Sequence, residues 1–225
     1  MAVDSAVGRV ALRVGDLDRL VSFYTDVVGL ALIERTDDRA SLGVGDTPLL
    51  ELGHAPEASA RDREAAGLFH TAVRVPDRRA LGAALARIEA DWQLDGASDH
   101  RVSEALYLRD PEDNGIEIYC DRPRAEWPTA GGRVQMDTLA LDLDALRAVA
   151  ADGPRLPPPT DIGHVHLEVP ALEPARAFYV DTLGFTLRQA VDGALFVAAG
   201  DYHHHVGLNV WNERSVAGTG RGLDW

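Results

Sequence analysis

The chain repeats one pattern of residues three times, and this internal repeat constrains its fold more than any other feature. Residues 162–169 copy residues 7–14, and each of these segments is followed by a Phe-Tyr pair at the same place in its repeat, Phe23–Tyr24 and Phe178–Tyr179. A further copy begins at residue 68. Self-similarity of this kind marks a chain built from repeated supersecondary units that bury their apolar faces against one another.

Each copy is predicted to be a β-α-β-β-β unit. In the first, residues 9–14 alternate between apolar and polar side chains, and apolar residues from Leu17 to Val28 recur at helical spacing until Gly29 ends the helix. Turn-forming residues separate the later apolar runs. The expected strands after this helix are 31–35, 39–44 and 48–52. The second unit is expected to have a strand at 68–75, a helix at 77–90 and strands at 104–109 and 116–120. The third is expected to have a strand at 162–169, a helix at 172–183 and strands at 186–190, 194–198 and 206–210.

These units predict an α+β fold of tandem modules. We expect two modules in residues 1–120 (1–55 and 66–120), a linker at 121–160 with a helix near 143–151, and a third module in 161–225. Residues 220–225 repeat the pattern of residues 66–70, so the same segment is expected to hold the start of a truncated fourth module. The Phe-Tyr pairs of both repeats are assigned to the core.

The composition excludes several classes of protein. Of the 225 residues 36 are acidic and 22 are basic, and the formal net charge of −14 argues against binding to nucleic acid. Every basic residue is arginine, which is typical of a salt-rich cytoplasm or of a GC-rich genome, although simple codon bias explains it equally well. Cys120 has no second cysteine to pair with, and neither a leader nor a membrane-spanning segment is indicated, so a cytoplasmic location is expected.

Three motifs resemble the vicinal oxygen chelate superfamily, which includes glyoxalases, bleomycin resistance proteins and extradiol dioxygenases. They are histidines at the starts of strands, the segment 110–119 (DPEDNGIEIY) and the segment 202–209 (YHHHVGLN). Within the superfamily the chain looks most like catechol 2,3-dioxygenases. The resemblance implies that pairs of modules form cup-shaped mixed sheets with helices outside, and that metal ligands come from the first and last strands of the modules.

The repeat alignment tests which pair of modules could hold a metal in this way. At the first-strand position the modules have Arg9, His70, His164 and Trp225 in turn, and at the last-strand position Glu51 and Glu117 in the first two. Pairing of modules two and three is the arrangement that brings two imidazoles and one carboxylate together. That set is the facial triad of non-heme Fe(II) oxygenases. We therefore predict that His70, His164 and Glu117 bind Fe(II), with Mn, Ni or Zn as alternatives, and that Glu51 forms an ion pair with Arg9.

Strand alternation supplies the remaining predicted site residues. It places Glu117 and Tyr119 toward the cup and residues 116, 118 and 120 behind it. The same rule puts His203, His205 and Asn209 on the cup side of the third module. The predicted catalytic residues are His205 as the base, Tyr119 and His100. The predicted substrate contacts are His166, His203, Asn209 and Tyr202, although packing, capping or solvent exposure would explain several of these side chains equally well.

The resemblance implies Fe(II)-dependent extradiol cleavage of catechol or a substituted catechol by O2. A glyoxalase-like isomerase or lyase is an alternative, but it would want a second carboxylate, which the third module does not offer. A metal-free binding or resistance protein is the other alternative. The expected partners are thus a small aromatic diol and O2, with no nucleic acid and no membrane. A homodimer is also plausible, because module one would otherwise expose a half-cup.

Overall fold

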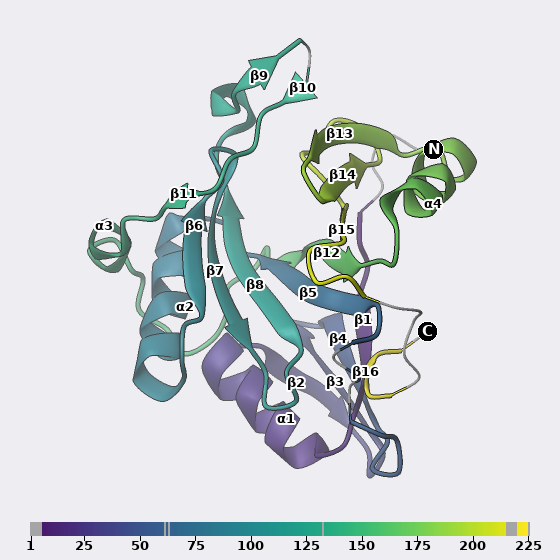
Figure 1. The fold of residues 1–225 in the computed structure, drawn as a ribbon. Helices are drawn as coiled ribbons and strands as arrows, with labels where there is room; N and C mark the ends of the chain where they lie inside the picture. Colours follow the sequence, from purple (N-terminus) through teal and green to yellow (C-terminus); the bar gives the residue numbers. More distant parts are fainter. Residues whose placement is uncertain (1–5, 61, 63, 132, 215–219, 225) are drawn as a thin grey trace.

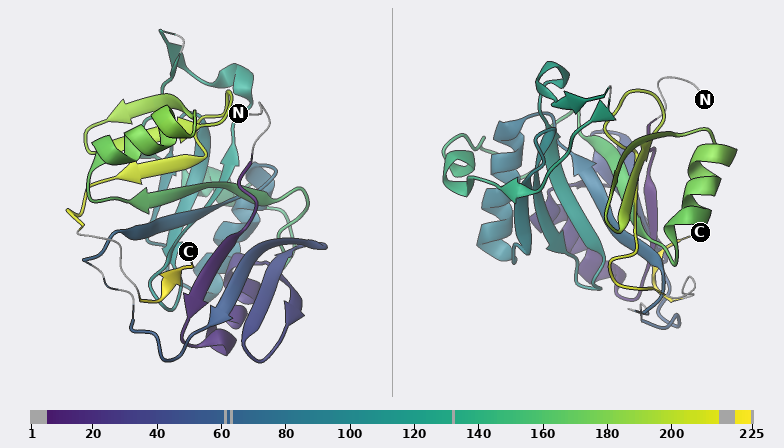
Figure 2. Two further views of the ribbon diagram at one scale, coloured as in Figure 1. Left: turned by 90° about the vertical axis from the view of Figure 1, so that its right-hand side faces the viewer. Right: turned by 45° about the horizontal axis from the view of Figure 1, so that its top comes forward.

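The computed structural model describes residues 6–224 except 61, 63, 132 and 215–219. Its main strands form two mixed sheets, one of five strands in the order β16-β1-β4-β3-β2 and one of nine strands in the order β11-β6-β7-β8-β5-β12-β15-β14-β13. The larger sheet curls into a half-barrel, so that β6 to β8 face β13 to β15 across its concave side (Figure 1). The helices lie outside the sheets, with α2 and α4 on opposite outer sides (Figure 2).

The first module has the predicted order of elements. Its helix begins where Asp16 accepts a hydrogen bond from the backbone N–H of Arg19, and it ends at Gly29, whose φ of 93° favours glycine. The apolar stripe Leu17, Leu20 and Val21 is buried, as the helical spacing predicted. The elements are β1 (Val10–Val14), α1 (Leu17–Phe23), a π-helical turn η1 (Tyr24–Val28), β2 (Ala31–Arg35), β3 (Arg39–Val44) and β4 (Thr47–His54).

The second module also forms four strands and one helix. Asp77 caps α2 by accepting from the backbone N–H of Ala80, and Leu81, Leu85 and Ile88 on its inner face are fully buried. One strand, β6, was missed because its residues are small and polar and show no apolar alternation. The elements are β5 (Gly67–Arg74), α2 (Arg78–Asp91), β6 (Gly96–Asp99), β7 (Ser103–Arg109) and β8 (Gly115–Asp121).

The third module contributes the other half of the large sheet. Its helical segment has no fully buried residue, and Phe178 is 51% exposed, so the assignment of this phenylalanine to the core is wrong. The equivalent Phe23 and Tyr24 are buried where η1 packs on α2, whereas α4 lies on the other outer side of the sheets, away from α2. The elements are β12 (Asp161–Glu168), α4 (Leu172–Arg176), a π-helical turn η3 (Ala177–Thr182), β13 (Thr186–Val191), β14 (Ala194–Ala198) and β15 (Val206–Asn209).

The segment expected to be a linker also adds to the folded structure. It contains the 3-10 turn η2 (Arg124–Glu126), a projecting hairpin of β9 (Thr129–Ala130) and β10 (Arg133–Val134), then β11 (Leu139–Ala140) and α3 (Leu143–Arg147). β11 pairs with β6 at the edge of the large sheet. Residues just before β11 therefore lie beside the concave side of the half-barrel.

Modules two and three pair through their first strands. β5 and β12 run antiparallel, with His70 opposite His166 and Ala72 opposite His164, so the pairing predicted from the histidines is confirmed. At the tail, β16 (Gly222–Leu223) pairs antiparallel with β1. The predicted first strand of a fourth module therefore begins beside module one, whereas Trp225, assigned to its ligand position, lies outside the described residues. None of the described helices is long and apolar enough to span a membrane.

Candidate metal centre

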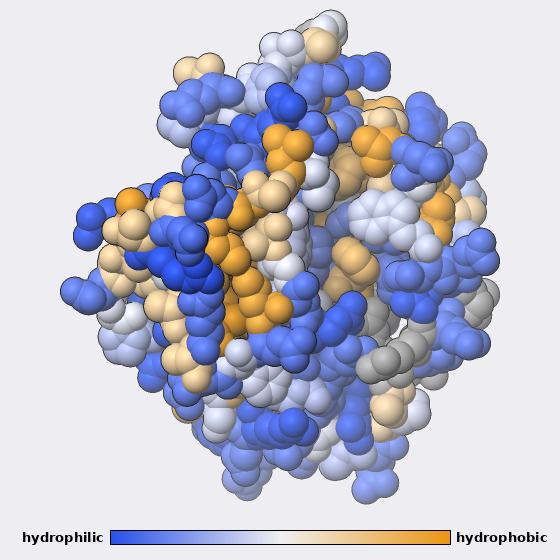
Figure 3. Space-filling model, turned by 60° about the vertical axis from the view of Figure 1, so that its left-hand side comes forward, coloured by the Kyte–Doolittle hydropathy of each residue, from blue (hydrophilic) through white to orange (hydrophobic). Residues whose placement is uncertain are grey.

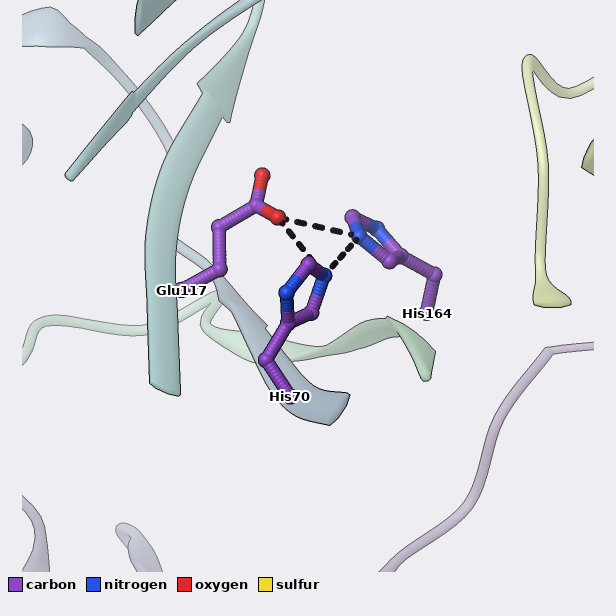
Figure 4. A group of neighbouring side chains, drawn as sticks. All are labelled: His70, Glu117 and His164. Carbon is purple, nitrogen blue, oxygen red and sulfur yellow. Dashed lines mark hydrogen bonds and ion pairs between the residues drawn. The ribbon is translucent and has the colours of Figure 1, made fainter. Parts of the chain in front are cut away.

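Three side chains from three adjacent strands of the large sheet converge on one point (Figure 4). Glu117 Oε2 lies 3.0 Å from His70 Nε2 and 3.2 Å from His164 Nε2, and the two Nε2 atoms lie 3.4 Å apart. In the described part of the chain this is the only group of three or more such side chains close enough to hold one ion. The sequence-predicted ligands are thus brought together.

Strand order explains this convergence. β5 lies between β8 and β12 in the sheet, and it pairs parallel with β8 and antiparallel with β12. Alternation then directs the three side chains to the same face, with Ile116, Ile118 and Cys120 in the core on the other face of β8. The equivalent position in module one carries Arg9, whose Nη1 lies 3.3 Å from Glu51 Oε1, so the predicted ion pair there is confirmed.

Burial and the charges of neighbouring side chains favour the binding of a cation by these three side chains. His70, Glu117 and His164 are 6%, 3% and 2% exposed. Burial alone would raise the pKa of Glu117, but His164 and His70 hold that pKa well below its ordinary range. Burial lowers the pKa of His164 to about 4, against the attraction of Glu117. An ionised carboxylate beside neutral imidazole is the state in which these groups bind metal.

The spacing also fits one ion. Ligands bound at about 2.1 Å and at right angles to one another lie about 3.0 Å apart, close to the separations of these three atoms. The donor set of two imidazoles and one carboxylate leaves other positions on an ion open. The residues present therefore fit a divalent transition metal held on one face.

A cavity of about 540 Å³ opens beside these side chains on the concave side of the half-barrel. All three line it, together with His100, His166, His204 and Tyr107. Of the predicted substrate contacts, His166 lies in the cavity with its Nε2 buried and without a hydrogen-bond partner. Burial lowers the pKa of His166 well below its ordinary value, so its ring is neutral.

The histidine that lines the cavity from segment 203–205 is His204, not His205. β15 begins only at Val206, so strand alternation does not extend back to these residues and the predicted orientation of His205 is wrong. The His204 ring lies 4.1 Å from that of His164, measured between centroids, and burial lowers its pKa well below the ordinary value. The Nδ1 of His205 instead accepts from the backbone N–H of Ala199, outside the cavity.

A buried hydrogen-bond chain lies behind His204. His204 Nδ1 is 2.8 Å from His203 Nδ1, and His203 Nε2 is 3.0 Å from Asp121 Oδ1. Hydrogen bonds from His203 and the charge of Arg74 hold the pKa of Asp121 below its ordinary value in spite of burial. Because an ionised carboxylate only accepts, His203 donates through Nε2 and, when neutral, accepts at Nδ1 from His204. The Nε2 of neutral His204 is thereby left without a proton.

Besides His205, four of the predicted site residues do not line the cavity. The Tyr119 hydroxyl lies 2.7 Å from that of Tyr202, which donates to Asp121, so both phenols belong to the network behind His204. His203 is buried in the same network, and the Oδ1 of Asn209 accepts from the backbone N–H of Trp211. The catalytic role predicted for Tyr119 and the substrate contacts predicted for Tyr202, His203 and Asn209 are therefore corrected.

His100 lines the cavity and is joined there by Tyr107, which the sequence reading missed. His100 Nδ1 donates to the backbone carbonyl of Asp137 at 2.6 Å, so its Nε2, when neutral, accepts from the Tyr107 hydroxyl at 2.6 Å. Burial and Glu117 raise the pKa of Tyr107 well above its ordinary value. Tyr107 pairs across the β7–β8 hairpin with Glu117, and that predicted hairpin was the signal that could have located it.

The comparisons with known proteins show which family and fold the chain is similar to. Residues 6–118 and 161–222 match the Glyoxalase/Bleomycin resistance protein/Dioxygenase superfamily. The chain is 44% identical over 220 residues to a protein of Bacillus subtilis (strain 168) named catechol-2,3-dioxygenase, and the match covers 95% of this chain and 77% of that protein. Among solved structures, a V278E mutant of glyoxalase I from Zea mays superposes with a TM-score of 0.58 at 18% identity, covering 97% of this chain and 71% of that one. Glyoxalase I itself from Zea mays gives 0.54 at 18% identity, covering 97% and 72%.

Proposed function

The chain belongs to the glyoxalase/bleomycin resistance/dioxygenase superfamily, and we propose that within it this protein is an Fe(II)-dependent extradiol dioxygenase that cleaves catechols with O2. The observation that carries the proposal is the convergence of His70, Glu117 and His164 at the end of a cavity large enough for an aromatic ring. The 44% identity to a protein named catechol-2,3-dioxygenase supports it.

The proposed ligands of Fe(II) are His70, His164 and Glu117. When bound in such a set, Fe(II) keeps positions open for a catecholate and O2 and allows electron density to pass between them. A set with one carboxylate favours this chemistry over that of a glyoxalase-like isomerase. At the matching place in module three the chain has Gly207 and Asn209, which supply no second carboxylate.

Side chains that line the cavity are proposed to accept and donate the protons of the reaction. His204 Nε2, left unprotonated by the chain to Asp121, is the proposed acceptor of a catechol proton and its later donor. The hydroxyl oxygen of Tyr107, which donates its proton to His100 Nε2 when that ring is neutral, can accept a hydrogen bond from substrate. Burial of the three ligand side chains excludes bulk water from the reacting end of the cavity.

The test is anaerobic loading with Fe(II), addition of catechol and then air, with the yellow ring-opened product followed by absorbance. Glu117→Gln should lose iron binding, measured by metal analysis, and product formation. Glu51→Gln is the matched control, because Glu51 takes the same place in module one but pairs with Arg9, and it should keep both. A folded, iron-loaded sample that forms no ring-opened product from any catechol would overturn the proposal.

His70→Ala and His164→Ala test the ligand set separately. Each should abolish iron binding, since each removes one of only three protein ligands. If iron stayed bound in His70→Ala and was lost only in His164→Ala, the proposed site across the two modules would be wrong.

A further inference from the structure

The cavity also has an apolar wall, built from β5, the third module and the segment between β10 and β11. We define this apolar wall by five lining residues: Phe69, Met136, Val191, Phe196 and Trp211. Its rings contact one another and the imidazole of His166. The centroid distances are 5.7 Å for Phe69–Trp211, 5.2 Å for Phe69–His166, 5.4 Å for His166–Trp211 and 5.7 Å for His166–Phe196. This wall offers a neutral aromatic surface directly beside the site.

The apolar wall is held in place and reaches the surface. Met136 comes from the segment after β10, and its backbone N–H and carbonyl both bond the side-chain amide of Gln189, at 2.7 and 3.0 Å. Gln189 itself lies on β13, so these bonds attach that segment to the third module. Trp211 and Val191 are 49% and 42% exposed. A substituent on the ring of a bound substrate that extends along the apolar wall would therefore reach the protein surface.

No cation faces this space among the described residues. None of the described arginines lines the cavity, and the chain contains no lysine. Asp137 lines it, but its carboxylate is paired with Arg101, which does not line the cavity, within a molecule of formal net charge −14. On the face drawn in Figure 3 charged and polar side chains also predominate, and apolar ones gather in separate patches. A carboxylate on the substrate would lose hydration here and gain no ion-pair partner.

We propose that the preferred substrates are catechols that carry a neutral, apolar ring substituent, and that catechols with a carboxylate side chain are rejected. This inference rests on the proposed ring cleavage and adds a substrate class to it. The apolar wall supplies the attraction, through burial of the substituent. A lining without arginine or lysine supplies the discrimination against anions.

The experiment compares kcat/KM of the iron-loaded enzyme for catechol, 4-propylcatechol and 3,4-dihydroxyphenylacetate. Each methylene group that leaves water should raise kcat/KM by about fourfold. The carboxylated substrate should fall at least about tenfold below catechol, because its charge is desolvated without a partner. Equal values for the propyl and carboxylated substrates, or a preference for the latter, would overturn the inference.

Two variants link the effect to the apolar wall. Trp211→Ala should remove most of the advantage that 4-propylcatechol has over catechol, whereas Trp211→Phe should retain it. Val191→Arg places a cation at the half-exposed mouth and should improve the carboxylated substrate selectively. An unchanged preference in both Trp211→Ala and Val191→Arg would show that the apolar wall does not set specificity.

Binding measurements separate this inference from the proposed reaction. Titration calorimetry under anaerobic conditions gives affinities for the same three ligands, whether or not product forms. If no catechol is cleaved but 4-propylcatechol binds more tightly than 3,4-dihydroxyphenylacetate, ring cleavage fails and the assigned ligand class stands. If product forms but the two bind equally, only the ligand class fails.

Discussion

At the scale of single residues, one carboxylate determines which nitrogen of His204 carries a proton. Asp121 accepts from His203 through Oδ1 and from Arg74 through Oδ2. Arginine can only donate, so the side of Asp121 that faces Arg74 must accept. The ionised carboxylate itself therefore sets the direction of the hydrogen-bond chain to the cavity, and the contact with Arg74 determines how an amide at this position would turn.

Asp121→Asn is predicted to reverse this chain. The amide oxygen should turn to Arg74, which leaves the NH2 group facing His203 and places a proton on His204 Nε2. We expect kcat for catechol cleavage to fall roughly 10²-fold, within the range of general acid–base contributions, with little change in KM. Nitrogen-15 NMR of the histidines should report the exchanged tautomers. Asp161→Asn, which alters the other carboxylate on Arg74, should keep the tautomers, and a wild-type tautomer pattern in Asp121→Asn would contradict the argument.

Cys120 gives a prediction for pH. Burial, together with Glu104 and Asp121, raises the pKa of this thiol from 9.0 to about 12. The folded state therefore favours the protonated thiol, so this group's contribution to stability is complete below pH 9 and declines as pH rises toward 12. The free energy of unfolding should fall by about 1 kcal/mol between pH 9 and 10 from this cause. Cys120→Val should lack that part of the decline in denaturant titrations, and an identical decline in both proteins would count against it.

The candidate ligands could be found from the sequence because the repeat aligns His164 with His70 and Arg9, and Glu117 with Glu51. Alternation on β8 also placed Glu117 correctly. The sequence could not show that His204, and not His205, lines the cavity. Alternation predicts which side of a sheet a residue faces only within a strand, and β15 begins after both histidines. The chain from His204 to Asp121 joins residues 83 positions apart, which no local pattern reveals.

At the scale of elements, the pairing of β5 with β12 depends on a close approach at Gly163. A Cβ on this residue would lie 1.7 Å from the Tyr119 hydroxyl oxygen, whereas one on Gly8, its counterpart in module one, would meet nothing within 4 Å. The same sequence position is therefore constrained in one module and free in the other. The difference comes from the second module, since Gly163 lies against the side chain of Tyr119 on β8, the strand beyond β5 in the sheet.

Gly163→Ala should consequently destabilise the protein by about 1–3 kcal/mol, the usual effect of overpacking, and Gly8→Ala should not. Thermal unfolding of the two variants measures the difference. Adding Tyr119→Phe removes the clashing oxygen and should restore part of the loss in Gly163→Ala. If the two glycine variants unfolded at the same temperature, the close approach would not be a source of specificity in this pairing.

Most strands of the repeats could be predicted because apolar alternation and turn residues define them. β6 and β11 could not, since Gly96–Asp99 is small and polar and Leu139–Ala140 is only two residues long. Both form through the register of a neighbouring strand. The segment predicted to be a linker also lacks apolar alternation. It nevertheless contributes Met136 and Asp137 to the lining of the cavity. Sequence pattern thus described the modules well and the connection between them poorly.

At the scale of the whole molecule, the excess of acidic residues governs how the fold responds to salt. With 36 acidic and 22 basic residues, like-charge repulsion acts across the entire surface, while each exposed ion pair contributes about 0–1 kcal/mol. Salt screens both effects, but the repulsion is carried by many more pairs of charges. Screening should therefore stabilise the folded state on balance.

We predict that Tm rises by several degrees when NaCl is increased from about 0.01 to 1 M at pH 7, over which the screening length falls from about 30 to 3 Å. The same increase in salt should have little effect near the isoelectric point, where the net charge vanishes and only the ion pairs remain to be screened. Calorimetry at both pH values separates screening from general salt effects on hydration, which act at either pH. A Tm that falls with salt at pH 7 would mean that the arginine–carboxylate pairs, and not the net charge, dominate the electrostatics of this fold.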